Sequence, residues 1–153
     1  MPDQEQDEHI LEQEFQVECG DFIHAGEVSS RIKTCLKEIG VPQDVIRRAA
    51  IATYESEMNV VMHGGDGDFM LTVDPEDILI DVRDDGAGIE NIELAFQEGY
   101  STATPEHREM GFGAGMGLPN IKRNADSIEV RSEKGKGTHL KIGLKVGQDG
   151  SKD

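Results

Sequence analysis

Four short segments, met in a fixed order along the chain, constrain its fold more than any other feature. The first places an acid, an amide and a histidine at helical spacing, and the other three place glycines beside apolar runs. Each pattern alone is common, because glycines mostly serve turns, but the ordered set is typical of a nucleotide site. The segments are Glu55…Asn59 with His63, Asp84-x-Gly86-x-Gly88, Gly113-x-Gly115-x-Gly117 and Gly137-Thr138.

The length and composition are those of one compact domain. With 153 residues, of which 36% are hydrophobic, the chain can bury a single core. No run approaches the roughly 20 apolar residues that span a bilayer, and the acidic start lacks the positive charge of a signal peptide. We therefore expect a cytoplasmic protein with no membrane partner. Cys19 and Cys35 have no CxxC spacing, so we expect reduced, packed thiols rather than a disulfide framework or a zinc site.

The charge of the chain argues against nucleic acid as a partner. Thirty-one acids against fifteen Lys and Arg residues give a net charge of −16, and no basic stripe is present. Such a field opposes binding to a polyphosphate duplex. A free nucleotide can still bind, because local backbone N–H groups and a metal ion outweigh the overall field.

Periodicity and turn residues divide the chain into a tail, a domain and a second tail. We expect an acidic flexible tail at 1–13, one domain at 14–146 and a flexible C-terminal tail at 147–153. Within the domain, a long polar stretch at about 99–114 is typical of a lid. The predicted strands are 15–19, 69–73, 78–82, 127–131 and 139–146, and the predicted helices are 28–39, 42–63, 90–96 and 118–126.

Glu55 and Asn59 lie four residues apart on a predicted helix, so their side chains project from one face about 6 Å apart at Cβ. His63 extends the same row. A carboxylate in this place can orient or deprotonate an attacking hydroxyl, and an amide oxygen can ligate Mg²⁺ without adding charge. The alternative is a solvated helix face.

Asp84 follows an apolar strand and precedes a glycine turn, which brings an acid and accessible backbone to one strand end. An ionised Asp accepts hydrogen bonds from an exocyclic amino group such as that of adenine. The alternative is an ordinary Asp-Gly turn. Asp85 is the member of the pair that we expect to face solvent.

The segment Gly113-Ala114-Gly115-Met116-Gly117 directly precedes a predicted helix, so its N–H groups and the positive end of the helix dipole suit phosphates. It lacks the surroundings of a dinucleotide fingerprint and the Lys-Ser/Thr ending of a P-loop. The alternative is a flexible hinge. Thr138 can donate its hydroxyl to a phosphate, although β-propensity also explains it. For Lys122 and Arg123 a solvated helix face is favoured over phosphate contact.

With these residues in place, residues 14–146 resemble the GHKL ATPase superfamily, which includes gyrase, certain chaperones, histidine kinases and mismatch-repair ATPases. The stretch 55–64, an acid followed by Asn and then His-Gly, resembles the N-box of the small anti-sigma serine/threonine kinases. The stretches 98–102 and 113–123 are more similar to the switch kinases of bacterial stress-signalling modules. The resemblance implies a Bergerat-type α/β fold, an α+β two-layer sandwich with a mixed, largely antiparallel sheet on one face and helices on the other.

The resemblance also implies roles for the residues singled out above. It makes Glu55 the general base, Asn59 the Mg²⁺ ligand and Asp84 the reader of adenine. Thr138 completes an ATP pocket whose backbone contacts come from Gly86, Gly88, Gly113, Ala114, Gly115, Met116 and Gly117. The implied reaction transfers the γ-phosphate of ATP to a Ser or Thr of a STAS-domain protein. A sigma factor and a second copy of the chain are further implied partners.

Other functions of the same fold remain open at this point. One is an anti-sigma factor that works mainly by sequestering a sigma factor. Another is a stand-alone histidine-kinase-like ATP-binding module. The severed ATP domain of a sensor histidine kinase is disfavoured, because we expect no preceding helical hairpin with a phosphoacceptor His; His9 lies in the acidic tail and His24 at a helix start. The presence of both Glu55 and Asn59 argues against a pseudoenzyme. The lid residues 103–110 look like an insertion, and Arg108 among them is expected to be a solvated charge.

Overall fold

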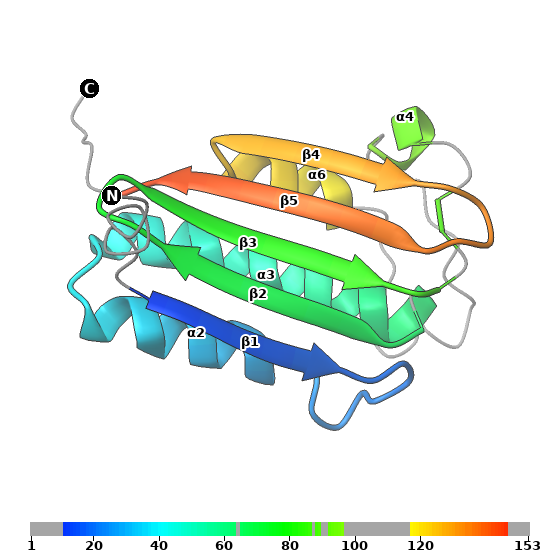
Figure 1. Cartoon of the computed structure of the whole chain (residues 1–153), viewed down its shortest axis with the longest axis horizontal. Helices are drawn as coiled ribbons and strands as arrows, with labels where there is room; N and C mark the ends of the chain where they lie inside the picture. The colour runs from blue at the N-terminus through cyan, green and yellow to red at the C-terminus, as the bar shows by residue number, and fades with distance from the viewer. Residues whose placement is uncertain (1–10, 64, 87, 90–91, 97–116, 147–153) are drawn as a thin grey trace, which may run out of the picture.

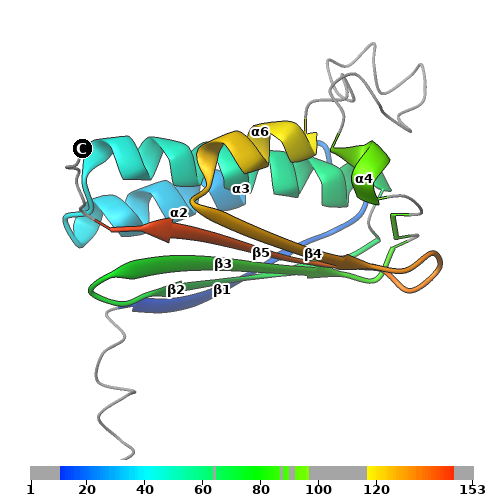
Figure 2. The same ribbon diagram turned by 90° about the horizontal axis from the view of Figure 1, so that it is seen from above.

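The computed structural model describes residues 11–63, 65–86, 88–89, 92–96 and 117–146, which form two layers. One layer is a five-stranded sheet with the order β1-β2-β3-β5-β4, and the other consists of helices that cover one face of it (Figures 1 and 2). The strands are β1 (Leu11–Val17), β2 (Gly67–Val73), β3 (Asp77–Asp84), β4 (Ser127–Ser132) and β5 (Thr138–Lys145). The helices are α2 (Glu27–Glu38), α3 (Gln43–His63), α4 (Ile92–Ala95) and α6 (Gly117–Asn124).

The sheet follows the alternation of apolar and polar residues in its strands. Ile80 at the centre of β3 pairs with Leu71 of β2 and Ile142 of β5, and all three side chains are fully buried toward the helices. All four strand pairings in the described part of the chain are antiparallel. The predicted α/β sandwich with helices on one face is confirmed, and the predicted hairpin of β2 and β3 is present.

Helix α3 lies in the middle of the helical layer, between α2 and α6 (Figure 1). Its small residues Ala49 and Ala52 are fully buried, which lets the helix approach the sheet closely. Pro42 directly precedes the helix, where its fixed φ and missing N–H cost nothing. None of the described helices has the combination of length and apolar character that crossing a bilayer requires.

Several element boundaries differ from the sequence prediction. β1 begins at Leu11, inside the segment expected to be a tail, because its pairing with β2 continues to Val73. Helix α6 begins one residue earlier than predicted and ends at Asn124, and α4 is shorter than the predicted helix. The tail residues 1–10, the C-terminal segment 147–153 and the predicted lid lie outside the described residues.

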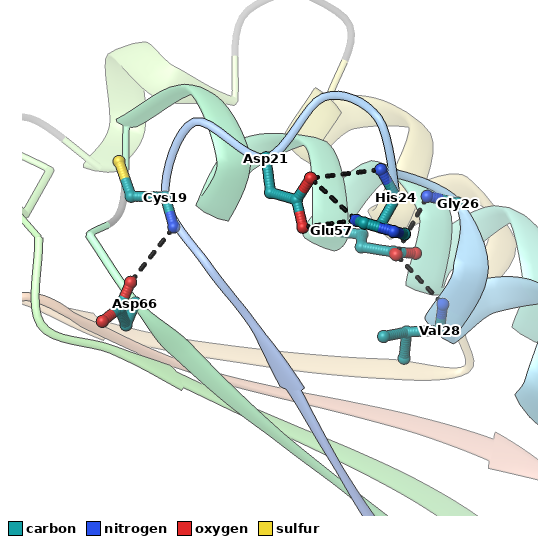
Figure 3. Close-up of polar contacts among 7 residues, drawn as sticks. All are labelled: Cys19, Asp21, His24, Gly26, Val28, Glu57 and Asp66. Atoms are coloured by element: carbon teal, nitrogen blue, oxygen red, sulfur yellow. Dashed lines mark hydrogen bonds and ion pairs between the residues drawn. The ribbon is translucent and has the colours of Figure 1, made fainter.

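A buried carboxylate ties α3 to the start of α2. Glu57 is 1% exposed and accepts three backbone hydrogen bonds, from the N–H groups of Gly26 at 2.9 Å, Val28 at 3.0 Å and Ser29 at 3.1 Å. Figure 3 shows this carboxylate beneath the turn that leads into α2. Burial raises the pKa of the Glu57 carboxyl, and the three N–H donors oppose that shift. Glu57 therefore acts as the N-terminal cap of α2, supplied by another helix.

The connection between β1 and α2 is fixed by two further acids (Figure 3). Asp66 accepts a hydrogen bond from the backbone N–H of Cys19 at 3.1 Å, and Asp21 binds both the backbone N–H and the ring of His24. Both thiols are free, but only Cys35 is partly buried, so the prediction of packed thiols is wrong for the exposed Cys19.

We predict that Glu57→Ala destabilises the protein by about 2–4 kcal/mol, because three N–H groups in a buried region lose their acceptor. Urea unfolding followed by far-UV circular dichroism measures the change. Glu38→Ala, at an exposed position near the other end of α2, is the matched control and should change stability by less than about 0.5 kcal/mol. Equal stability of the two variants would contradict the capping role.

Candidate nucleotide site

The predicted site residues that the structure describes gather at one end of the sandwich. At this end β3 terminates, β5 begins, α3 reaches its C-terminal half and α6 starts (Figures 1 and 2). The antiparallel order of the sheet brings the end of β3 beside the start of β5, because Asp84 pairs with Thr138. Segments more than fifty residues apart in the sequence therefore form one surface.

Glu55 projects from α3 toward α6. Its Oε2 accepts a hydrogen bond of 3.0 Å from the side-chain amide of Asn120, and both residues are half-buried. Burial raises the pKa of the Glu55 carboxyl, and the hydrogen bond from Asn120 opposes that shift. A carboxylate with a raised pKa and remaining acceptor capacity is suited to take a proton.

Asn59 lies one turn further along α3, against the first residue of α6. A methyl group at Gly117 would lie 3.2 Å from Oδ1 of Asn59, so the glycine leaves the space that the amide occupies. Among the described residues there is no cluster of three or more His, Cys, Asp or Glu side chains that could hold a metal ion. Mg²⁺ does not require such a cluster, since it is often held by one or two protein oxygens together with phosphates and water. The amide oxygen of Asn59 fits that requirement.

Asp84 is the last residue of β3, and its carboxylate accepts a hydrogen bond from the turn that follows. The backbone N–H of Gly86 donates to Oδ1 at 3.0 Å. Burial raises the pKa of the Asp84 carboxyl, and backbone hydrogen bonds from Gly86 and Thr138 oppose that shift. The neighbouring Asp85 is exposed, as predicted, but it also accepts a hydrogen bond of 2.9 Å from the backbone N–H of Asp66.

The loop after β3 is held against the turn between β4 and β5 by a hydrogen bond and by close backbone packing. Ser132 at the end of β4 accepts a hydrogen bond of 2.6 Å from the backbone N–H of Ile89, and its hydroxyl lies 2.8 Å from that of Thr138. A side chain on Gly88, whose φ is 81°, would collide with the backbone oxygen of Glu133. Gly137, with a φ of 87°, would collide in the same way with the backbone oxygen of Asp84. Both glycines are therefore required by protein packing.

The structure brings the predicted residues together in two groups. Glu55, Asn59 and Gly117 meet where α3 faces α6, whereas Asp84, Gly86, Gly88 and Thr138 meet at the ends of β3 and β5. Gly113, Ala114, Gly115 and Met116 lie outside the described residues, as does the side chain of His63. Lys122 and Arg123 are exposed on α6, as predicted.

Sequence reasoning missed two residues of this region, Asn120 and Ser132. Asn120 lies three residues after Gly117, in the first turn of α6, and a polar residue so near a glycine segment was the available signal. Ser132 carried no signal, because Ser is ordinary at a strand end. A separate cavity of about 350 Å³ opens between β1 and the start of α2, and none of the predicted site residues lines it.

Comparison with protein-family models matches residues 44–148 to the family described as histidine kinase-, DNA gyrase B- and HSP90-like ATPases. The chain belongs to this family. The match covers more than half of the chain and includes both groups of the site, from Glu55 on α3 to Thr138 on β5. Membership in this ATPase family implies ATP binding, and it confirms the resemblance to GHKL proteins.

Several curated relatives of this chain are named anti-sigma F factors, and three of them show the extent of the similarity. The protein of Clostridium acetobutylicum is 34% identical over 95 residues, which cover 59% of this chain and 63% of that protein. The protein of Thermoanaerobacter sp. (strain X514) is 33% identical over 103 residues, covering 64% and 68%. The protein of Caldanaerobacter subterraneus is 30% identical over 118 residues, covering 77% and 71%. The chain thus spans about two thirds of the length of these relatives.

A solved structure agrees with the fold of this chain. The RsbU and RsbW domains of a Mycobacterium tuberculosis protein superpose with a TM-score of 0.52 and 14% identity, covering 90% of this chain and 33% of that one. At this level of identity the likeness supports the fold.

We predict that Gly137→Ala destabilises the protein by about 2–5 kcal/mol, because it adds a collision with the Asp84 backbone to the cost of a left-handed residue. Gly135 lies two residues earlier in the same turn, also at positive φ, but has open space around it. Gly135→Ala is therefore the matched control and should cost about 1–2 kcal/mol. Equal losses in urea unfolding would show that backbone conformation, rather than contact with Asp84, sets the requirement.

Proposed function

We propose that this chain is an ATP-dependent serine/threonine protein kinase that acts as a partner-switching regulator and phosphorylates a Ser or Thr of a STAS-domain protein. The observation that carries the proposal is the placement of Glu55 and Asn59 on one face of α3, directly against the start of α6. An acid able to accept a proton and an amide able to hold Mg²⁺ thus lie beside the first turn of α6, which begins at Gly117. We propose a cytoplasmic setting, where both ATP and a protein substrate are available.

The proposed reaction assigns a task to each of these residues. The hydroxyl oxygen of the partner protein bonds to the γ-phosphorus while the bond from that phosphorus to the β–γ bridging oxygen breaks, and ADP leaves. The hydroxyl proton passes to the carboxylate of Glu55, which is the general base. Mg²⁺ held by the amide oxygen of Asn59 would neutralise phosphate charge. Positioning and charge neutralisation supply most of the catalysis in phosphoryl transfer.

The second group of residues is proposed to bind the nucleotide base. Asp84 retains acceptor capacity beyond its bond to Gly86, and a carboxylate there suits the exocyclic amino group of adenine. Gly86, Gly88 and Thr138 form the adjoining backbone wall. The glycines of 113–117, together with the N-terminus of α6, are proposed to bind the phosphates.

A second function, sequestration of a sigma factor, is favoured by the names of the relatives, which are anti-sigma F factors. In that case the chain would bind the sigma factor directly, and phosphorylation of the STAS-domain protein would reset the complex. The two functions are compatible. A second copy of the chain is also among the proposed partners.

We predict that Glu55→Gln lowers phosphoryl transfer by about 10²–10⁴-fold, because the general base is lost while the shape of the side chain is kept. The measurement is transfer of label from γ-labelled ATP with Mg²⁺ to STAS-domain proteins of the same genome. ATP affinity, measured by calorimetry, should stay within a few-fold of the wild type. Undiminished transfer by Glu55→Gln would remove Glu55 from the role of base.

We predict that Asp84→Asn weakens ATP binding by about 10–100-fold, because a charge-assisted hydrogen bond to the base is worth roughly 1.5–3 kcal/mol. The same calorimetric titration with GTP should show that the wild type discriminates against guanine and that the variant loses part of this preference. Asp85→Asn is the matched control for ATP affinity and is expected to leave it unchanged. An unchanged ATP affinity of Asp84→Asn would contradict the assignment of Asp84.

The outcomes separate the two proposed functions. Labelled STAS-domain protein that is absent with Glu55→Gln supports the kinase. Binding of ATP without any labelled candidate, together with a sigma factor that co-purifies, supports sequestration alone. Absence of both ATP binding and transfer would overturn the assignment of the site.

A further inference from the structure

The side chain of Asn120 lies between an acid and a cation. Its Nδ2 donates to Oε2 of Glu55 at 3.0 Å, and its Oδ1 accepts a hydrogen bond from the guanidinium of Arg123, one turn later on α6. Asn120 therefore uses both ends of its amide in contacts that the proposed roles of Glu55 and Asn59 leave unexplained.

The chemistry of the two neighbours permits one orientation of the amide. A guanidinium has donors only, so it requires the amide oxygen, and an ionised carboxylate has acceptors only, so it requires the amide nitrogen. Arg123 thus fixes which way the Asn120 amide faces. The oriented amide then gives Glu55 a donor that favours its ionised form.

The contact also joins two elements that carry different parts of the site. Glu55 comes from α3 and Asn120 from α6, whose first residue contacts Asn59. The carboxylate has two oxygens, and the amide occupies Oε2. Among the described residues no hydrogen bond reaches Oε1, which can therefore face an incoming hydroxyl.

We propose that Asn120 is a positioning residue, which holds the Glu55 carboxylate through Oε2 so that Oε1 accepts the substrate proton, and that Arg123 sets the orientation of the Asn120 amide. This inference rests on the proposed kinase function. In the described part of the chain, burial and the hydrogen bond from Asn120 act on the Glu55 carboxyl, and Arg123 reaches it through the Asn120 amide. Lys122 instead lies over the ring of Phe96, 5.8 Å from its centre.

The first measurement does not depend on activity. The titration of the Glu55 carboxyl is followed by NMR in nucleotide-free protein labelled at Glu, and its signal is assigned by its absence from Glu55→Gln. Asn120→Leu, which is close in size to Asn but has no donor, should raise the pKa of Glu55, since burial then acts without the opposing hydrogen bond. Arg123→Met should move the pKa in the same direction by less.

The second measurement is the pH profile of phosphoryl transfer. Asn120→Leu should lower kcat by about 10–100-fold, the loss expected for a hydrogen bond to a charged group, with KM for ATP within about twofold. The acid limb of the kcat profile should move to higher pH, because a general base must be ionised. Asn124→Ala is the matched control, since Asn124 donates to the backbone oxygen of Asn120 and not to its side-chain amide, and it should leave both quantities unchanged.

The two measurements separate the inference from the proposed function. If Asn120→Leu keeps its fold by circular dichroism and leaves the pKa of Glu55 and the pH profile unchanged, the positioning role is overturned. If Glu55→Gln transfers phosphate normally, the proposed base is wrong, and positioning of a base by Asn120 is overturned with it. If Glu55→Gln is inactive and Asn120→Leu shows the raised pKa with the shifted acid limb, the inference stands.

Discussion

The burial of α3 against the sheet is the constraint on which the rest of the structure depends. Ala49, Ala52 and Val60 are at most 1% exposed, so both the rotation and the depth of this helix are fixed by close packing. Once the rotation is fixed, the helical period decides where every polar residue on α3 points. The packing of the helix therefore directs Glu55 and Asn59 to α6.

Glu55 and Glu57 show how the same side chain is adapted to two uses on one helix. Glu57 faces α2 and is saturated by three backbone donors, which suits a permanent structural contact. Glu55 faces α6 and accepts one hydrogen bond in the described part of the chain, which leaves it able to accept a proton. Both the number of donors around each carboxylate and its depth of burial distinguish the cap from the proposed base.

The sequence was sufficient to predict elements that rest on periodicity. The helix at 42–63 and the hairpin of β2 and β3 were predicted close to their observed bounds, because apolar spacing and turn residues mark them directly. The sequence was insufficient wherever a residue contacts a segment that is distant in the sequence. Nothing in the sequence near Glu57 marks it as the cap of a helix thirty residues earlier, and nothing near Gly88 marks its contact with Glu133. Such pairings exist only after strand order and helix packing are set.

The turn between β4 and β5 has two sides that differ in how much added chain they can accept. At Gly135 there is open space, whereas Gly137 is pressed against the backbone of Asp84. A peptide tag or a fluorophore attached beside Gly135 would point into solvent and spare the fold. The same addition two residues later would push the start of β5 away from the end of β3. A reporter placed at the first position would therefore lie close to the site without deforming it.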